Sequence, residues 1–311
     1  MSQQYIIEIA DLTKAYGDFV AVDKLNLSIG EAEVFGFLGP NGAGKTTTIL
    51  MLLGLTEPKS GSIRIGGYDP AREPLKVKSI VGYLPEKIGF YEDLTAKQNL
   101  DYTAALNGLS RKDASEKIDE LLNTVGLSAA AGQKVGQFSH GMKQRLGIAD
   151  VMVKDPKIAI FDEPTSGIDP EGIDQILNLI ANMAKRKITV VLSSHQLQQV
   201  QRVCTRVGIL ASGHLVAEGS IDSLGRNAIG GGKFRIEVQV SQPTDKLIES
   251  IKNIKGVLKI ESDGDLLLIS CDEDLRPQIA RAVVDSDSLL VQMKAEEYGL
   301  EEIYLKYFRE S

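Results

Sequence analysis

The sequence predicts an α/β fold followed by a smaller α+β domain. Short apolar runs, such as residues 33–38 and 157–162, alternate with stretches of helical period, which is typical of an α/β core. A glycine-rich motif at 39–47 joins one of these runs to a helix. After three glycines at 230–232 the order of strands and helices changes, and 311 residues are enough for two domains.

The composition is that of a globular protein, with 43% hydrophobic and 25% charged residues. A net charge of −7 argues against a nucleic-acid partner, because neutralising phosphates takes a basic surplus. Cys204 and Cys271 lack metal-ligand spacing and are expected to be buried thiols in a reducing compartment. No run approaches the ~20 apolar residues that span a bilayer, and residues 1–11 lack a signal-peptide core. We therefore expect a cytoplasmic protein.

Residues 5–10 and 25–30 alternate as strands, and residues 14–17 form a turn between them. Tyr16 in this turn could stack on an adenine ring, since a flat aromatic face accepts a purine without hydrogen bonds. A partly buried packing role is the alternative.

The motif at 39–47 fits G-x-x-x-x-G-K-[ST] without a gap, between a strand at 33–38 and a helix at 48–55. Glycines let the backbone wrap and aim N–H groups at phosphates. Lys45 adds a positive charge there, and the Thr46 hydroxyl is the expected Mg²⁺ ligand. The motif therefore predicts a nucleoside triphosphate site.

Strands are predicted at 61–67 and 79–84, the second ending before Pro85 and Glu86. Helical spacing follows at 95–107 and 111–125. These helices interrupt a strand-rich region, so we expect an inserted helical subdomain at about 87–155.

Residues 138–145 open a helix that runs to about Val153. Ser139 is the predicted N-cap, and Gly141 would let the backbone come close to an anion. An ordinary capped helix start is the alternative reading of the same residues.

An apolar strand at 157–162 ends in Asp162 and Glu163. Two carboxylates there are costly unless a cation or hydrogen bonds offset their charge. Asp162 can hold the water shell of Mg²⁺, and Glu163 can polarise the attacking water. A solvated strand end is the alternative reading.

A helix to about residue 184 precedes a strand at 187–192, and His195 follows it. At the end of a parallel strand, where ligands tend to bind, His195 could reach a phosphate or remain structural. His140 and His214 have no such support. A hairpin through Ser212 and Gly213 closes the first domain.

The chain after the glycines reads β-α-β-β-α-β and resembles a ferredoxin-like unit. Its predicted strands and helices lie at 234–240, 244–255, 257–262, 265–271, 275–286, 288–293 and 299–309. No catalytic cluster is found in it, so contact, dimerisation or regulation is its expected role.

The motifs run in one order through residues 1–220, from Tyr16 to His195, and no Asn-Lys-x-Asp guanine motif occurs. This order resembles the nucleotide-binding domain of an ABC transporter over about two-thirds of the chain. The resemblance implies a P-loop NTPase fold of ABC type, with a mixed sheet core, over 1–224. A linker at 225–232 and an accessory domain at 233–311 would follow.

The resemblance also implies roles. Glu163 would be the catalytic base, with Lys45 and His195 contacting phosphate, and Thr46, Asp162 and Glu86 would hold Mg²⁺. Two copies would bury two ATP molecules head to tail, so Ser139 and Gly141 would act in trans on the partner's nucleotide. ATP would contact Tyr16, Gly39, Pro40, Asn41, Gly42, Ala43, Gly44, Lys45, Thr46, Thr47, Ser139 and Gly141.

Two positions depart from the family pattern. The common Leu-Ser-Gly-Gly-Gln is here Phe138 to Met142, with only the serine and the second glycine retained, and Glu86 replaces a glutamine. Both changes look like those of exporter ATPases that pair with a separate membrane permease at the inner face of the cell membrane. The alternatives are a soluble ABC-type ATPase acting on ribosomes or nucleic acid, and a scaffold without turnover, which Glu163 argues against. The resemblance implies that the membrane partner chooses the cargo.

Overall fold

A computed structural model describes residues 5–221, 223–224, 234–286 and 288–297. The chain divides into two compact units, Met1–Val216 and Ala217–Ser311, so the last strand of the first unit, His214–Gly219, runs across the limit. The predicted linker at 225–232 lies outside the described residues. The predicted domain limits at 224 and 233 stay predictions.

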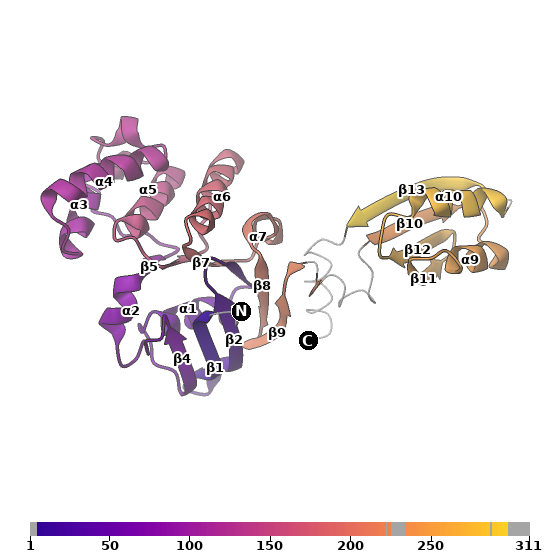
Figure 1. Ribbon diagram of the computed structural model, residues 1–311, viewed down its shortest axis with the longest axis horizontal. Helices are drawn as coiled ribbons and strands as arrows, with labels where there is room; N and C mark the ends of the chain where they lie inside the picture. The colour runs from indigo at the N-terminus through magenta and orange to yellow at the C-terminus, as the bar shows by residue number, and fades with distance from the viewer. Residues whose placement is uncertain (1–4, 222, 225–233, 287, 298–311) are drawn as a thin grey trace. The chain divides into compact units, whose positions relative to one another are not determined.

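The first unit contains two sheets, which confirms the predicted mixed α/β core (Figure 1). An antiparallel sheet of order β2-β1-β4 consists of β1 (Tyr5–Tyr16), β2 (Phe19–Gly30) and β4 (Ser60–Ile65). A sheet of order β5-β6-β7-β3-β8-β9 consists of β3 (Val34–Leu38), β5 (Val81–Leu84), β6 (Ile158–Asp162), β7 (Thr189–Ser194), β8 (Arg206–Ala211) and β9 (His214–Gly219). Its strands from β5 to β8 are parallel.

The central parallel strands are buried along their whole length, as expected where both faces of a sheet are covered. One hydrophobic cluster joins Ile7 of β1, Phe35 of β3, Ile49 of the first helix and Ile160 of β6. It therefore lies between the two sheets and fixes the loop that follows β3.

The first unit also carries seven α-helices and two 3₁₀ turns within the part that the structure describes. They are α1 (Lys45–Leu52), α2 (Pro74–Ile80), α3 (Ala96–Leu106), α4 (Arg111–Thr124), α5 (His140–Met152), α6 (Pro170–Lys185), α7 (Leu197–Val203), η1 (Ser128–Ala130) and η2 (Val135–Gln137). Helices α3, α4 and α5 pack together beside β5 (Figure 1). They form a helical part between β5 and β6.

Several element limits differ from the predicted ones. Tyr16 ends β1 instead of lying in a turn, and the helix predicted from residue 48 begins at Lys45. Residues 79 and 80 belong to α2 and not to a strand. Pro74 starts that helix, because its missing N–H costs nothing at the first helical position.

The second unit has the predicted β-α-β-β-α-β order. It consists of β10 (Phe234–Val240), α9 (Asp245–Lys252), β11 (Val257–Asp263), β12 (Leu266–Cys271), α10 (Arg276–Asp285) and β13 (Leu290–Glu297). Strand β12 lies between β10 and β11, which makes a split β-α-β unit as in ferredoxin-like folds. The predicted helix at 299–309 lies outside the described residues.

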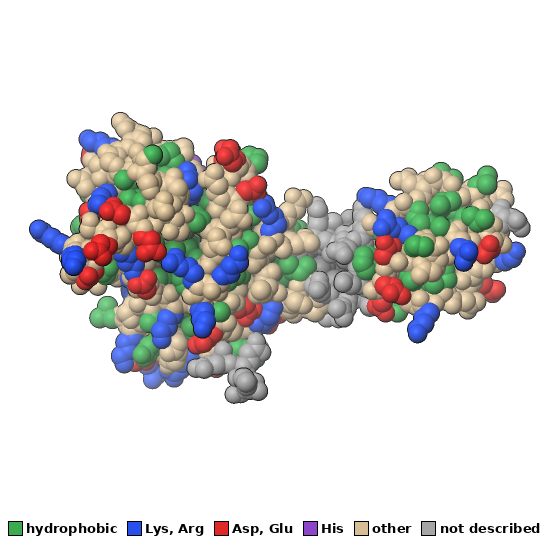
Figure 2. Space-filling model, turned by 45° about the horizontal axis from the view of Figure 1, so that its top comes forward, with side chains coloured by type: hydrophobic (Ala, Val, Ile, Leu, Met, Phe, Trp, Pro, Cys, Tyr) green, Lys and Arg blue, Asp and Glu red, His purple; other side chains and the backbone are tan. Residues whose placement is uncertain are grey.

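On the face of the first unit seen in Figure 2, acidic and basic side chains are interspersed. No helix among the described residues is long and apolar enough to cross a membrane.

Asp150 lies near the C-terminal end of α5, and burial raises the pKa of its carboxyl. Its Oδ1 accepts no hydrogen bond within the described residues. A raised pKa means that the folded chain binds the proton more tightly than the unfolded chain. Stability is therefore lost as the pH rises above the unfolded pKa of about 4. The helix dipole also disfavours a negative charge there.

We expect Asp150→Asn to raise the Tm of the first unit by about 2–4 °C at pH 7, equivalent to about 1 kcal/mol. Because the carboxyl protonates in acid, this gain should shrink as the pH falls towards about 4. Calorimetry at several pH values measures both effects, with Asp101→Asn on the exposed face of α3 as the control. An unchanged or lowered Tm at pH 7 would contradict the unfavourable burial of this carboxylate.

Candidate functional site

A cavity of about 440 Å³ lies at the loop between β3 and α1, among residues of several strand ends. Most of its wall consists of residues predicted for the site. The lining residues are Tyr16, Phe19, Ala21, Pro40, Asn41, Gly42, Gly44, Lys45, Thr46, Thr47, Glu86, Glu163, Ser166 and His195.

The loop conformation depends on glycine. Gly44 has φ +102°, in the left-handed region, and caps α1. A Cβ there would come within 2.6 Å of the Ala21 carbonyl oxygen, so a larger residue would have to move the backbone. The first N–H groups of α1 have no carbonyl acceptor within the helix, so they are available to bind an anion at this end.

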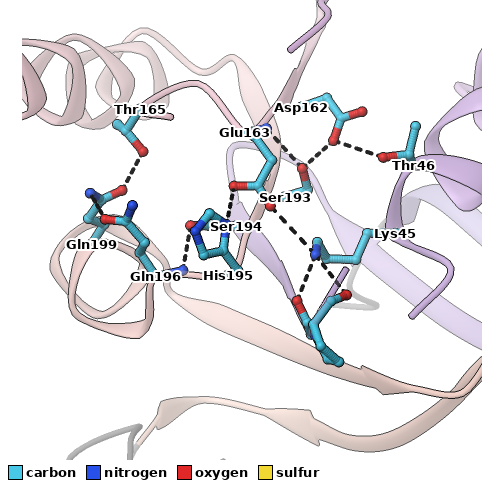
Figure 3. Close-up of polar contacts among 12 residues, drawn as sticks. Lys45, Thr46, Asp162, Glu163, Thr165, Ser193, Ser194, His195, Gln196 and Gln199 are labelled. Carbon is cyan, nitrogen blue, oxygen red and sulfur yellow. Dashed lines mark hydrogen bonds and ion pairs between the residues drawn. The ribbon is translucent and has the colours of Figure 1, made fainter. Parts of the chain in front are cut away.

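Lys45 is 5% exposed, and two carbonyl oxygens and one carboxylate offset its positive charge (Figure 3). Its Nζ donates to the carbonyl oxygens of Gly39 at 2.6 Å and Pro40 at 3.2 Å. It also lies 3.5 Å from Glu163 Oε1, an ion pair too long to be a hydrogen bond. Glu163 Oε1 accepts no hydrogen bond among the described residues. The lysine therefore joins the loop to the acidic end of β6.

Glu163 has φ +49°, an uncommon conformation for a residue with a side chain. Its backbone N–H donates to Ser193 Oγ at 3.0 Å, and its Oε2 lies 2.9 Å from His195 Nδ1. The side chain is 11% exposed, whereas that of His195 is 45% exposed. The turn thus holds a buried carboxylate at the cavity wall, between a lysine and a histidine.

Asp162 is the end of β6, and its Oδ1 accepts hydrogen bonds from Ser193 Oγ at 2.5 Å and Thr46 Oγ1 at 3.3 Å. Glu86 lies on the same cavity wall as Thr46. Burial, together with the negative charges of Asp162 and Glu86, raises the pKa of Tyr83 to about 12. Thr46 and Asp162 are thus in contact, and Glu86 shares the cavity wall with Thr46. Carboxylate and hydroxyl oxygens are ligands of the kind that Mg²⁺ takes.

Tyr16 lines the cavity and is half exposed, and Lys14 Nζ lies 4.9 Å from its ring centroid. Phe19 pairs with Tyr16 across the β1–β2 turn and is 63% exposed. Two aromatic rings are therefore available to a purine. Phe19 was not predicted for the site. Its place two residues after Gly17 could have indicated that it pairs with Tyr16 across a hairpin turn.

Ser139, Gly141, Gly39, Ala43 and Asp162 are not among the cavity-lining residues. Ser139 caps α5, since its Oγ accepts from the Met142 N–H at 3.2 Å, which confirms the predicted N-cap. Neither Ser139 nor Gly141 of α5 therefore lines this cavity. Ser193, which bridges both carboxylate residues, was also missed.

Comparisons with known proteins agree with this geometry. A family model described as ABC transporter matches residues 22–166. The chain is 46% identical to the bacitracin transport ATP-binding protein BcrA of Bacillus licheniformis, over 70% of this chain and 71% of that protein. It is 33% identical to the linearmycin resistance ATP-binding protein LnrL of Bacillus subtilis (strain 168), over 96% of this chain and 97% of that protein.

Among solved structures, one described as the ATP-binding subunit of an ABC transporter is 32% identical. The match has a TM-score of 0.66 and covers 71% of this chain and 92% of the other. A dimeric bacterial ABC transporter cassette has a TM-score of 0.63 at 25% identity, over 69% of this chain and 98% of that one. Together with the loop, the paired carboxylates and the histidine, these similarities lead to one conclusion: the chain belongs to the ATP-binding proteins of ABC transporters.

Proposed function

We propose that two copies of this chain bind ATP between them, hydrolyse it, and power export through a separate membrane permease. The observation that carries the proposal is the contact of Glu163 with both Lys45 and His195 at the wall of the loop cavity. A buried carboxylate beside the phosphate loop is placed to take a proton from water.

The residues at the cavity and at the end of β6 have separate proposed tasks. The N–H groups of the loop and Lys45 bind phosphate oxygens, and Tyr16 stacks on the adenine with Phe19 beside it. Thr46, Asp162 and Glu86 supply oxygens for Mg²⁺, which when bound would offset phosphate charge. Glu163 accepts the proton of the attacking water, and His195 orients Glu163 and reaches the terminal phosphate.

Ser139 and Gly141 are proposed to contact the nucleotide of the partner copy. They belong to the first turn of α5, whose N-terminal N–H groups favour an anion, and they do not line the chain's own cavity. A closed pair would then carry two ATP molecules, and hydrolysis would let it open.

Export is proposed because two of the relatives are named for bacitracin transport and linearmycin resistance. The same relatives are named as ATP-binding proteins, which supports a pathway for the cargo that is supplied by another subunit. That subunit would hold this chain at the inner face of the membrane and would choose the cargo.

The test is a pull-down from detergent-solubilised membranes with tagged Glu163→Gln protein, ATP and Mg²⁺. This variant should hold the closed state longest, and the same protein with ADP is the matched control. A multi-spanning membrane protein enriched with ATP supports the proposal. Ribosomes or DNA-bound proteins in its place would overturn it.

Ser139→Arg is expected to leave nucleotide binding by one copy unchanged and to prevent ATP-driven dimers. An arginine on the first turn of α5 adds bulk and a positive charge where the partner's loop must approach. Light scattering with ATP in the Glu163→Gln background measures the dimer, and fluorescent-ATP titration measures binding. Exposed Ser128→Arg, outside α5, is the control; undiminished dimers with Ser139→Arg would contradict the contact in trans.

A further inference from the structure

A turn after β6, residues 165–167, contacts the first residue of α5. His140 Nε2 lies 2.9 Å from the carbonyl oxygen of Ser166. A Cβ on Gly167 would lie 3.6 Å from the same imidazole ring, so the ring covers that glycine. Because a carbonyl only accepts, Nε2 carries the hydrogen and donates it. One side chain thus joins two segments that are 26 residues apart.

The other side of this turn is held by buried groups. The Thr165 hydroxyl hydrogen-bonds to Gln199 Oε1 of α7, and Gln199 donates in turn to Gln196 beside His195 (Figure 3). Thr165 and Gln199 are 3% and 8% exposed, whereas His140 is exposed. The turn is therefore anchored to α7 in the interior, and His140 anchors it to α5 at the surface.

Ser166 is a wall residue of the cavity that contains Lys45 and Glu163. His140 therefore connects that wall with the turn of α5 that carries Ser139 and Gly141. We propose that His140 is a positioning residue, which fixes the wall of the chain's own cavity relative to the residues that serve the partner's cavity. The inference rests on the proposed function, because only a head-to-tail pair gives α5 a second nucleotide to serve.

A glycine at position 140 would carry no side chain and could not make this bond. The bond is local and partly exposed, so its loss should not unfold the chain. A neutral hydrogen bond of this kind is worth about 1 kcal/mol, which corresponds to about fivefold in rate if the bond is needed in the reacting state.

The experiment compares His140→Phe, which keeps a ring without a donor, with His140→Gln, whose amide can still donate. The control is His214→Phe on β9, the same change at an exposed histidine outside the cavity wall. ATPase kinetics of the full chain should show kcat lowered about fivefold by His140→Phe, with KM for ATP within twofold. His140→Gln should recover at least half of the loss, and the Tm should not change.

Three results would overturn this inference: an unchanged kcat, a raised KM at unchanged kcat, or equal losses in both variants with a lowered Tm. The second would assign the ring to nucleotide contact and the third to folding alone. ATP-driven dimers of Glu163→Gln are measured in parallel. If that variant stays monomeric, the proposed function fails; if it dimerises and His140→Phe behaves as the wild type, only the role of His140 fails.

Discussion

Glu163→Gln is expected to bind ATP normally and to lose at least about 100-fold in kcat. General bases contribute roughly 10²–10⁴-fold to the rate. The neutral amide of glutamine is too weak a base to accept the proton of water. The substitution keeps the shape of a side chain that is 11% exposed and touches Lys45 and His195, so the cavity should remain formed. Phosphate release at saturating ATP measures turnover, and fluorescent-ATP titration measures affinity.

Glu33→Gln is the matched control, because Glu33 is also a buried, paired glutamate. Its side chain is 9% exposed, and its Oε1 lies 2.9 Å from Arg206 Nη1, away from the cavity lining. This change should cost stability and leave kcat per folded molecule within about twofold. Wild-type turnover in Glu163→Gln, or an equal loss in Glu33→Gln, would contradict the role of Glu163 as the base.

The parts of the fold that the sequence predicted well are those in which a few neighbouring residues restrict the backbone to one conformation. Ser212 and Gly213 both have positive φ, as a two-residue hairpin turn of type I′ requires. Helices α2 and α7 were missed, since each has only seven residues and one or two buried positions. So short an element shows no helical period, and its helicity depends on tertiary contacts.

The site shows the same division. The phosphate loop and the acidic end of β6 are contiguous motifs and could be found in the sequence. Ser193 is 31 residues from Asp162 and meets it because the two pair in register between β6 and β7. The contact of His140 with Ser166 likewise depends on how α5 lies against the turn after β6. Sheet register and helix packing bring together residues that are distant in the sequence, so no local sequence pattern predicts these contacts.

Lys45→Ala is expected to weaken ATP binding by at least about 100-fold and to abolish measurable turnover. The lysine supplies the one full positive charge of the loop motif, and charge-assisted bonds to phosphate are about twice as strong as neutral ones. Each 1.4 kcal/mol lost is tenfold in affinity. The loop would also lose the bonds that Nζ makes to the Gly39 and Pro40 carbonyl oxygens.

Lys45 is also expected to stabilise the free chain through its charge, and a variant that keeps the length of the side chain distinguishes this charge from its packing. Without Nζ, the buried Oε1 of Glu163 would face no cation from the loop, and a buried unpaired charge is destabilising. Lys45→Ala should therefore lower the Tm of the free chain, and adding Glu163→Gln should restore part of it. Lys45→Met, which keeps the stem, should bind ATP as weakly as Lys45→Ala. ATP titration and calorimetry of these variants test both statements, and near-normal affinity in Lys45→Met would show that the stem, and not the charge, holds the phosphates.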